Sequence, residues 1–359
     1  MPEPSKAPAK STDVANAGFS HLATKASSGQ ASKNSTDFLV LIIDVNPLSW
    51  ASNFSLSSQA SIASRELESV LDAILIFLNA HIAMQHENGL AVYAASLGLA
   101  KLLFTTAPFA SKGDLGGSSE AIKSKPDANT YQHFRHVDNA VLQGIRKMAR
   151  EVSEKDQTDT ASNQATLGIV SAMSQALCQL NRLTMTDQTG SEQSLSGKTP
   201  GTLAAKSSMS SRILILSATP DASTQYIPMM NCIFGAQKKG ILIDVCKMFG
   251  DDTVFLQQAS HLTGGSYFRL DEQLGLLQTL MSAYLPSRSI RELLNLPNQD
   301  EVDFRAACFC HRKIVDIGYV CSVCLSLFCE PRPQCLTCKS KYPQSTLERF
   351  AQENQNRIK

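Results

Sequence analysis

The chain has 359 residues, of which 43% are hydrophobic and 18% are charged, and its formal net charge is +1. At about 150 residues per domain, this length predicts one large domain with a smaller module. The balanced charge argues against a whole-chain electrostatic grip on nucleic acid or anionic lipid, because such binding needs a clustered basic surface. The longest strictly apolar strings have six residues, so we expect no membrane span and no signal peptide.

The predicted elements begin after a polar N-terminal segment. Residues 1–36 contain few large apolar side chains, so we expect a disordered tail. The apolar run 38–45 predicts a strand buried on both faces of a parallel sheet, with a ligand loop or turn after it. From Ser61 onward apolar residues recur at three- and four-residue steps, which predicts a helix that ends before Asn88 and Gly89.

The middle of the chain contains further strand and helix patterns. Strands at 90–98 and 101–106 are close enough to pair as antiparallel neighbours across Gly98. Segments at about 111–130 and 184–210 are rich in small polar residues, so we expect flexible insertions there. The remaining expected elements are helices at about 133–152, 165–183, 222–238, 252–263 and 273–284, and strands at 212–219, 240–248 and 266–270.

This alternation of strands and helices predicts the α/β class. We expect a Rossmann-like domain over 37–286, with a mostly parallel sheet covered by helices on both faces. A linker is expected over 287–307, a cysteine-rich module over 308–343 and a frayed tail over 344–359.

The cysteine-rich module carries the strongest chemical signal. Two Cys-x-x-Cys pairs, Cys321 with Cys324 and Cys335 with Cys338, are separated by ten residues. Each pair can place two sulfurs on one metal, and two such pairs close a tetrahedral site of four thiolates. Soft thiolates select zinc over calcium or magnesium. We therefore expect one structural zinc ion, with no position left for water or substrate.

Four further candidate ligands lie nearby: Cys308, Cys310, His311 and Cys329. Their order along the chain is compatible with a cross-braced pair of zinc sites. However, adjacent side chains rarely converge, so a Cys-x-Cys pair followed at once by His is poor geometry for one tetrahedral ion. A second zinc stays open, and the alternative is buried thiols that pack as small hydrophobic groups.

No sequence pattern proposes a catalytic or cofactor-binding site. The chain has no Gly-x-Ser-x-Gly, no His-Glu-x-x-His and no glycine-rich dinucleotide fingerprint. His81 lies on the apolar side of its predicted helix, so we expect a core imidazole. Between Arg305 and Tyr342 the net charge is +4, which permits weak phosphate contact but is sparse for a nucleic-acid footprint. Direct DNA contact stays open.

Two stretches carry a family resemblance. Residues 38–50 and 303–342, together with the elements between 61 and 96, resemble the small von Willebrand A subunit of the general transcription factor TFIIH. The resemblance implies a von Willebrand A domain followed by a C4 zinc finger. Cys321, Cys324, Cys335 and Cys338 match the finger, and the segments 1–36, 111–130 and 184–210 depart from the family.

The cation site of a von Willebrand A domain is the main point of departure. Such domains use Asp-x-Ser-x-Ser after the first strand, and this chain matches the pattern only at Asp44. Asn46 replaces the first serine, Leu48 replaces the second, and Thr219 stands near where a Thr-Asp pair is expected. We therefore expect Asp44 and Asn46 to fix a turn by local hydrogen bonds rather than to hold a cation.

The resemblance implies a non-catalytic structural subunit of the TFIIH core. Such a subunit acts in the nucleus, in RNA polymerase II initiation and nucleotide excision repair. The implied partner is the zinc-binding C-terminal region of the larger von Willebrand A subunit, and through it the DNA helicases, with no membrane. Three alternatives remain: a metal-dependent ligand-binding A domain with a cation beside Asp44, a RING-like ubiquitin ligase with two zinc ions, or a zinc-dependent nucleic-acid-binding adaptor.

Overall fold

The structure is a computed structural model. It describes residues 36–54, 60–107, 132–158, 168–193, 209–221, 225–270 and 275–291 and, between 293 and 345, all but 295, 297–301, 312 and 325. Residues 1–35 of the predicted tail, the predicted insertion at 111–130, residues 194–208 of the second insertion and residues 346–359 lie outside the described residues.

A six-stranded sheet forms the centre of the large domain, with the strand order β3-β2-β1-β4-β5-β6. Neighbouring strands are parallel except β2 and β3, which pair antiparallel as predicted. Gly98 makes the turn between them with a φ of 66°, a conformation that glycine adopts without steric cost. The strands are β1 (Asp37–Asp44), β2 (Gly89–Ser96), β3 (Leu99–Thr105), β4 (Ser210–Ser217), β5 (Leu242–Lys247) and β6 (Tyr267–Arg269).

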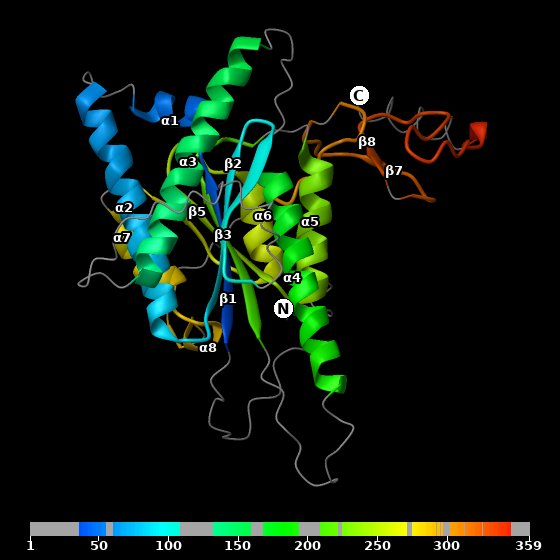
Figure 1. Cartoon of the computed structure of the whole chain (residues 1–359). Helices are drawn as coiled ribbons and strands as arrows, with labels where there is room; N and C mark the ends of the chain where they lie inside the picture. The colour runs from blue at the N-terminus through cyan, green and yellow to red at the C-terminus, as the bar shows by residue number, and fades with distance from the viewer. Residues whose placement is uncertain are drawn as a thin grey trace, which may run out of the picture. The chain divides into compact units, whose positions relative to one another are not determined.

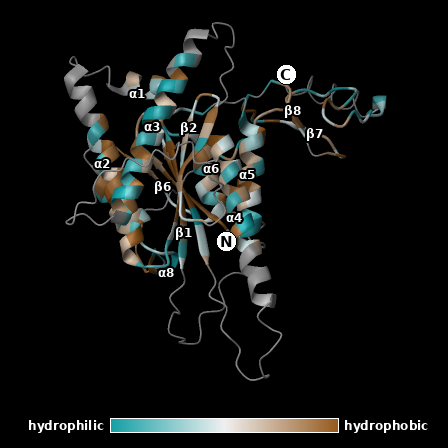
Figure 2. Ribbon diagram, in the orientation of Figure 1, coloured by the Kyte–Doolittle hydropathy of each residue, from teal (hydrophilic) through white to brown (hydrophobic). Residues whose placement is uncertain are grey.

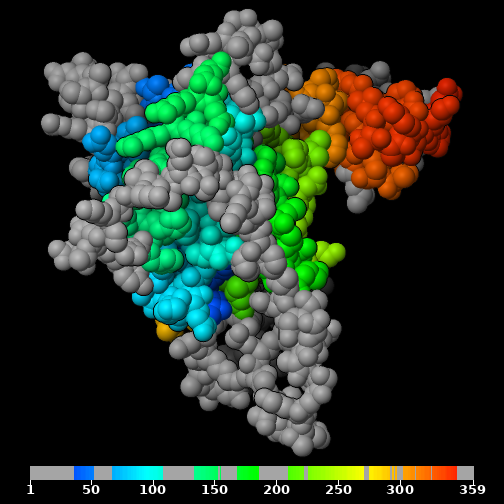
Figure 3. Space-filling view, in the orientation of Figure 1, coloured from blue at the N-terminus to red at the C-terminus, as the bar shows by residue number. Residues whose placement is uncertain are grey.

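Helices cover both faces of the sheet. α2, α3 and α7 lie on one face, and α4, α5 and α6 lie on the other (Figure 1). In the space-filling view, α3 and α4 form part of the visible surface (Figure 3). The helices are α1 (Pro47–Phe54), α2 (Ala60–Met84), α3 (Gln132–Thr158), α4 (Gly168–Gln193), α5 (Tyr226–Lys239), α6 (Val254–Thr263), α7 (Leu276–Thr279), the π-helical η3 (Leu280–Tyr284) and α8 (Arg288–Arg291).

The central strand explains how the two layers form. Successive side chains of a strand point to opposite faces, and every residue of β1 is buried. Leu39, Leu41 and Ile43 pack with α2 and α3, whereas the alternate residues from Phe38 to Ile42 pack with α4, α5 and α6. Figure 2 shows the hydrophobic residues concentrated on the strands. The predicted α/β fold, with a mostly parallel sheet between helices, is confirmed.

Helix α2 is the most apolar long helix that the structure describes. Its segment Leu67–Met84 is long and apolar enough to cross a membrane by length and composition. Val70, Ile74 and Phe77 in this segment are buried in the core, and a core helix passes the same test. His81 is also buried, with Nε2 3.2 Å from the carbonyl oxygen of Gly89, as predicted for a core imidazole. Burial lowers the pKa of His81.

The structure differs from the predicted elements in two places. Helix α1 follows β1 where a loop or turn was expected, and Pro47 occupies its first position, which its fixed φ favours. Helix α4 continues to Gln193, so the predicted insertion at 184–210 begins as helix. Extending a helix adds one hydrogen bond for each residue fixed, without a new nucleation cost, and polar residues can therefore continue it.

Candidate functional site

The carboxyl edge of the sheet, where α/β proteins commonly bind ligands, begins at Asp44. Asp44 is 2% exposed, and both of its carboxylate oxygens accept hydrogen bonds from the backbone. Oδ2 accepts from the backbone N–H of Ala218 at 3.0 Å and of Thr219 at 2.7 Å. Oδ1 accepts from the backbone N–H of Asn46 at 3.2 Å. The predicted local hydrogen bond between Asp44 and Asn46 is present, although it leads into helix α1, and the carboxylate also ties β1 to the end of β4.

The side chain of Asn46 occupies the same edge. Its Nδ2 donates to Ser49 Oγ at 3.0 Å and to Thr219 Oγ1 at 3.1 Å, and its Oδ1 accepts from the backbone N–H of Leu48 at 3.2 Å. A divalent cation needs oxygen ligands, whereas an amide NH₂ group is only a donor. The hydroxyl oxygens of Ser49 and Thr219 instead accept hydrogen bonds from this amide.

Lys247 completes this network from the end of β5. The side chain is 1% exposed, and Nζ donates to the carbonyl oxygen of Thr219 at 2.8 Å. Burial lowers the pKa of Lys247, and the charges of Asp44 and Asp221 act in the opposite direction. Sequence reasoning missed Lys247, although a lone lysine in the apolar run 241–248 was a usable signal. We call Asp44, Asn46, Ser49, Thr219 and Lys247 the carboxyl-edge network.

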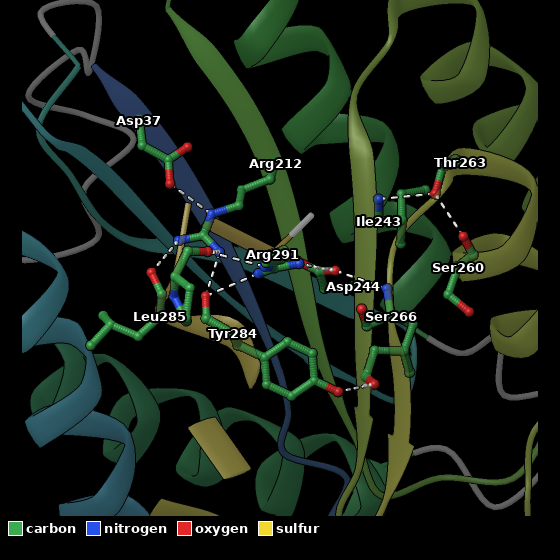
Figure 4. Close-up of polar contacts among 12 residues, drawn as sticks. Asp37, Arg212, Ile243, Asp244, Ser260, Thr263, Ser266, Tyr284, Leu285 and Arg291 are labelled. Carbon is green, nitrogen blue, oxygen red and sulfur yellow. Dashed lines mark hydrogen bonds and ion pairs between the residues drawn. The ribbon is translucent and has the colours of Figure 1, made fainter. Parts of the chain in front are cut away.

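A second buried polar cluster ties the end of η3 to the sheet (Figure 4). Arg212 Nε donates to Asp37 Oδ2 at 2.7 Å, and Arg291 Nη1 donates to both carboxylate oxygens of Asp244 at 2.7 and 2.8 Å. Both guanidinium groups also donate to the carbonyl oxygen of Tyr284. Arg291 lies in the predicted linker at 287–307, so the start of that segment packs into the large domain.

The four predicted zinc ligands lie together in the C-terminal module. One ligand atom from each of Cys321, Cys324, Cys335 and Cys338 lies within 4.8 Å of the others. Sγ of Cys321 is 3.7 Å from Sγ of Cys338, and Sγ of Cys324 is 3.6 Å from Sγ of Cys335. Four thiolates at about 2.3 Å from a zinc ion lie about 3.8 Å apart. The donor set and its spacing fit a tetrahedral metal ion.

Each Cys-x-x-Cys pair, Cys321 with Cys324 and Cys335 with Cys338, lies in a turn that is closed by the same kind of backbone hydrogen bond. The N–H of Cys321 donates to the carbonyl oxygen of Ser326, and the N–H of Cys335 donates to that of Ser340, both at 2.9 Å. The short antiparallel strands β7 (Tyr319–Val320) and β8 (Leu327–Phe328) flank the first turn. Backbone hydrogen bonds therefore help to hold the sulfurs together.

The second set of candidate ligands also converges. One ligand atom from each of Cys308, Cys310, His311 and Cys329 lies within 4.8 Å of the others. The sequence-based objection that these neighbouring side chains rarely meet is therefore wrong for this chain. The two clusters are interleaved along the chain, and each could hold a metal ion.

The three remaining cysteines, Cys178, Cys232 and Cys246, lie in the large domain and differ in burial. Burial raises the pKa of Cys246 to about 12, whereas Cys178 is exposed. Because the thiolate is the nucleophile, we expect iodoacetamide at pH 8 to modify Cys178 in the folded chain and to leave Cys246 unmodified until denaturant is added. Peptide mapping by mass spectrometry checks this, and equal rates at the two sites would contradict it.

The chain matches the family model described as transcription factor Tfb4 over residues 36–339. A curated relative from Schizosaccharomyces pombe, general transcription and DNA repair factor IIH subunit tfb4, is 42% identical over 305 residues, covering 85% of this chain and 88% of the relative. General transcription factor IIH subunit 3 of Dictyostelium discoideum is 35% identical, covering 76% of this chain and 67% of the relative.

A solved structure agrees with the sequence comparisons. The N-terminal domain of TFIIH p34 matches with a TM-score of 0.50 and 28% identity, covering 70% of this chain and 98% of that domain. The family match extends over both the large domain and the cysteine clusters up to residue 339. The chain therefore belongs to the Tfb4 family of transcription factor subunits.

Proposed function

We propose that this chain is a non-catalytic structural subunit of the TFIIH core complex. It acts in the nucleus, in RNA polymerase II transcription initiation and nucleotide excision repair, by protein–protein scaffolding. The observation that carries the proposal is the family match over 36–339, together with a TFIIH subunit that is 42% identical over 85% of this chain.

The geometry supports a binding role rather than catalysis. At the carboxyl edge, Asp44 and Asn46 are engaged by the chain itself, and Lys247 supplies a buried positive charge there. In the module, four thiolates can saturate one zinc ion, and a saturated ion has no position for water or substrate. Both features favour a surface that binds by shape and charge.

The proposed partner is the larger von Willebrand A subunit of TFIIH, through its C-terminal zinc domain. The DNA helicases of the core would be reached indirectly, and no membrane is involved. Direct DNA contact is disfavoured, because Arg305 pairs with Asp303 and Asp316, which reduces the positive charge of the module.

We assign one structural zinc ion to Cys321, Cys324, Cys335 and Cys338. The ion would hold the two turns at 321–326 and 335–340 together. Its chemistry is that of a closed tetrahedral site, which supplies folding free energy and no catalytic water.

Co-purification tests the proposed role. A tagged full-length chain purified from nuclear extract should bring down the TFIIH core subunits at near-equal stoichiometry, as identified by mass spectrometry. Prior zinc chelation should reduce this recovery if the module contributes to assembly. Recovery of the chain without any TFIIH subunit would reject the proposal.

Because the side chains of the carboxyl-edge network already make hydrogen bonds within the chain, we expect no specific divalent cation to bind there. We expect millimolar Mg²⁺ to leave the melting temperature and the partner affinity of the chain unchanged, because Lys247 already places a positive charge near Asp44. A specific ion at 100 times its Kd would stabilise the fold by about 2.7 kcal/mol. A Mg²⁺-dependent rise in melting temperature that Asp44→Asn abolishes would contradict this prediction.

One observation favours an alternative, because interleaved metal clusters are also the arrangement expected of a RING-like ubiquitin ligase. Incubating the chain with ubiquitin, ATP, an activating enzyme and a panel of conjugating enzymes tests this. We expect no ubiquitin conjugates above the level without the chain. Conjugates that depend on intact Cys321 would favour the ligase.

A further inference from the structure

The cluster of Cys308, Cys310, His311 and Cys329 is not explained by a single zinc finger of four cysteines. Sγ of Cys329 lies 3.4 Å from Sγ of Cys310 and 3.1 Å from Nδ1 of His311. Cys308 is 2% exposed, whereas His311 is exposed at the rim. We propose that these four residues bind a second structural zinc ion.

The backbone around Cys308 repeats the geometry of the other two metal-binding turns. The N–H of Cys308 donates to the carbonyl oxygen of Lys313 at 2.8 Å, five residues later. Cys321 and Cys335 make the same bond to residues 326 and 340. All three turns are therefore closed in the same way, although only two of them begin a Cys-x-x-Cys pair.

This repetition identifies the role of His311. In the other turns the second ligand stands three residues after the first, at Cys324 and Cys338. Three residues after Cys308 stands His311, so the first turn is a Cys-x-x-His pair of the same kind. The relevant spacing runs from Cys308 to His311, and the adjacent Cys310 is an additional ligand.

The fourth ligand reaches this turn through the strand pairing. Cys329 directly follows β8, and the backbone N–H of Phe309 donates to the carbonyl oxygen of Leu327 at 2.8 Å. Ala307 and Ile314 form a bridge that closes the base of the turn. The hairpin of β7 and β8 therefore joins the two clusters: Cys321 and Cys324 lie in the loop between its strands, and Cys329 follows its second strand.

The donor set suits zinc. Three thiolates and one imidazole occupy all four positions of a tetrahedral ion, as in other structural sites of the Cys₃His type. Sulfur ligands disfavour magnesium and calcium. This assignment does not depend on the proposed role in TFIIH, because it concerns the metal content of the isolated chain.

The metal content of the full-length chain tests the proposal. The chain, purified under reducing conditions and dialysed against metal-free buffer, should contain two zinc ions by plasma mass spectrometry. X-ray absorption should find seven Zn–S bonds at about 2.3 Å and one Zn–N bond at about 2.0 Å for every two ions. One zinc ion with sulfur ligands alone would overturn the proposal.

A pair of histidine variants identifies the nitrogen. His311→Cys should keep two zinc ions, because cysteine also ligates zinc, and it should abolish the Zn–N bond. His86→Cys replaces an exposed histidine outside the module and should leave the Zn–N bond in place. A Zn–N bond that survives in His311→Cys would overturn the assignment.

A disulfide is the competing explanation for the short distance between Cys310 and Cys329. It would lower the mass of the denatured chain by two hydrogens and would leave those two thiols unreactive toward alkylation. The proposal predicts the fully reduced mass and alkylation of both thiols once the zinc is removed. A disulfide in chain purified from the nucleus would overturn it.

Discussion

Replacing Cys321 by serine should release the zinc ion proposed for Cys321, Cys324, Cys335 and Cys338. This loss should unfold the module, while the large domain stays folded. Apparent binding free energies of structural zinc are about 10–16 kcal/mol in small zinc-finger peptides, so the loss of one ligand removes much of the folding free energy of the module. Zinc content and hydrogen exchange measured by mass spectrometry check this. We expect loss of amide protection over 308–343 and unchanged protection in the sheet.

The size of this effect follows from the small core of the module. Its buried hydrophobic cluster contains Cys321, Phe328 and Cys335, so two of the three buried residues are proposed metal ligands. A domain of this size cannot bury enough apolar surface to fold without a metal or disulfides. Removing the ion should therefore remove most of what holds the module together.

A matched variant in the same turn provides the control. Val323 lies between Cys321 and Cys324 and is 67% exposed, so Val323→Ser should keep the zinc content and the protection of the wild type. If Cys321→Ser retained zinc and full protection, the assignment of the ion to these four cysteines would be wrong.

Much of the large domain could be predicted from the sequence, because buried parallel strands read as continuous apolar runs. The strands predicted at 38–45 and 212–219 are β1 and β4, and the pair across Gly98 is antiparallel as expected. Helix α1 was missed because its eight residues show no clear apolar period. Asn46 and Pro47 were a usable start signal.

The functional residues were only partly predictable. The four cysteines of two Cys-x-x-Cys pairs are local in sequence, so their convergence could be anticipated. Lys247 contacts Thr219 from another strand, and no spacing rule connects the two. His311 was considered as a neighbour of Cys310, whereas the turn closed by the N–H of Cys308 leads us to propose that His311 and Cys308 form a ligand pair.

The buried cluster that ties η3 to the sheet should be the most sensitive polar site of the large domain. The Arg291 side chain is 9% exposed and that of Asp244 is fully buried, and Nη1 of Arg291 contacts both carboxylate oxygens of Asp244. Arg291→Gln removes the ion-pair partner of a buried carboxylate and a donor to the carbonyl oxygen of Tyr284. Breaking a buried pair in this way costs about 3–5 kcal/mol.

The expected result is a fall of roughly 10 °C in melting temperature, since a domain of this size loses about 2–4 °C for each kcal/mol. Arg269→Gln is the matched control, because Arg269 and its partner Asp252 are 45% and 44% exposed, and such surface pairs contribute about 1 kcal/mol or less. Adding Asp244→Asn to Arg291→Gln should recover part of the loss, because the uncompensated charge is then removed. Calorimetry on the wild type, Arg269→Gln, Arg291→Gln and the double variant measures the loss and its partial recovery. Equal losses of melting temperature in Arg291→Gln and Arg269→Gln would show that burial does not strengthen the ion pair of Arg291 with Asp244.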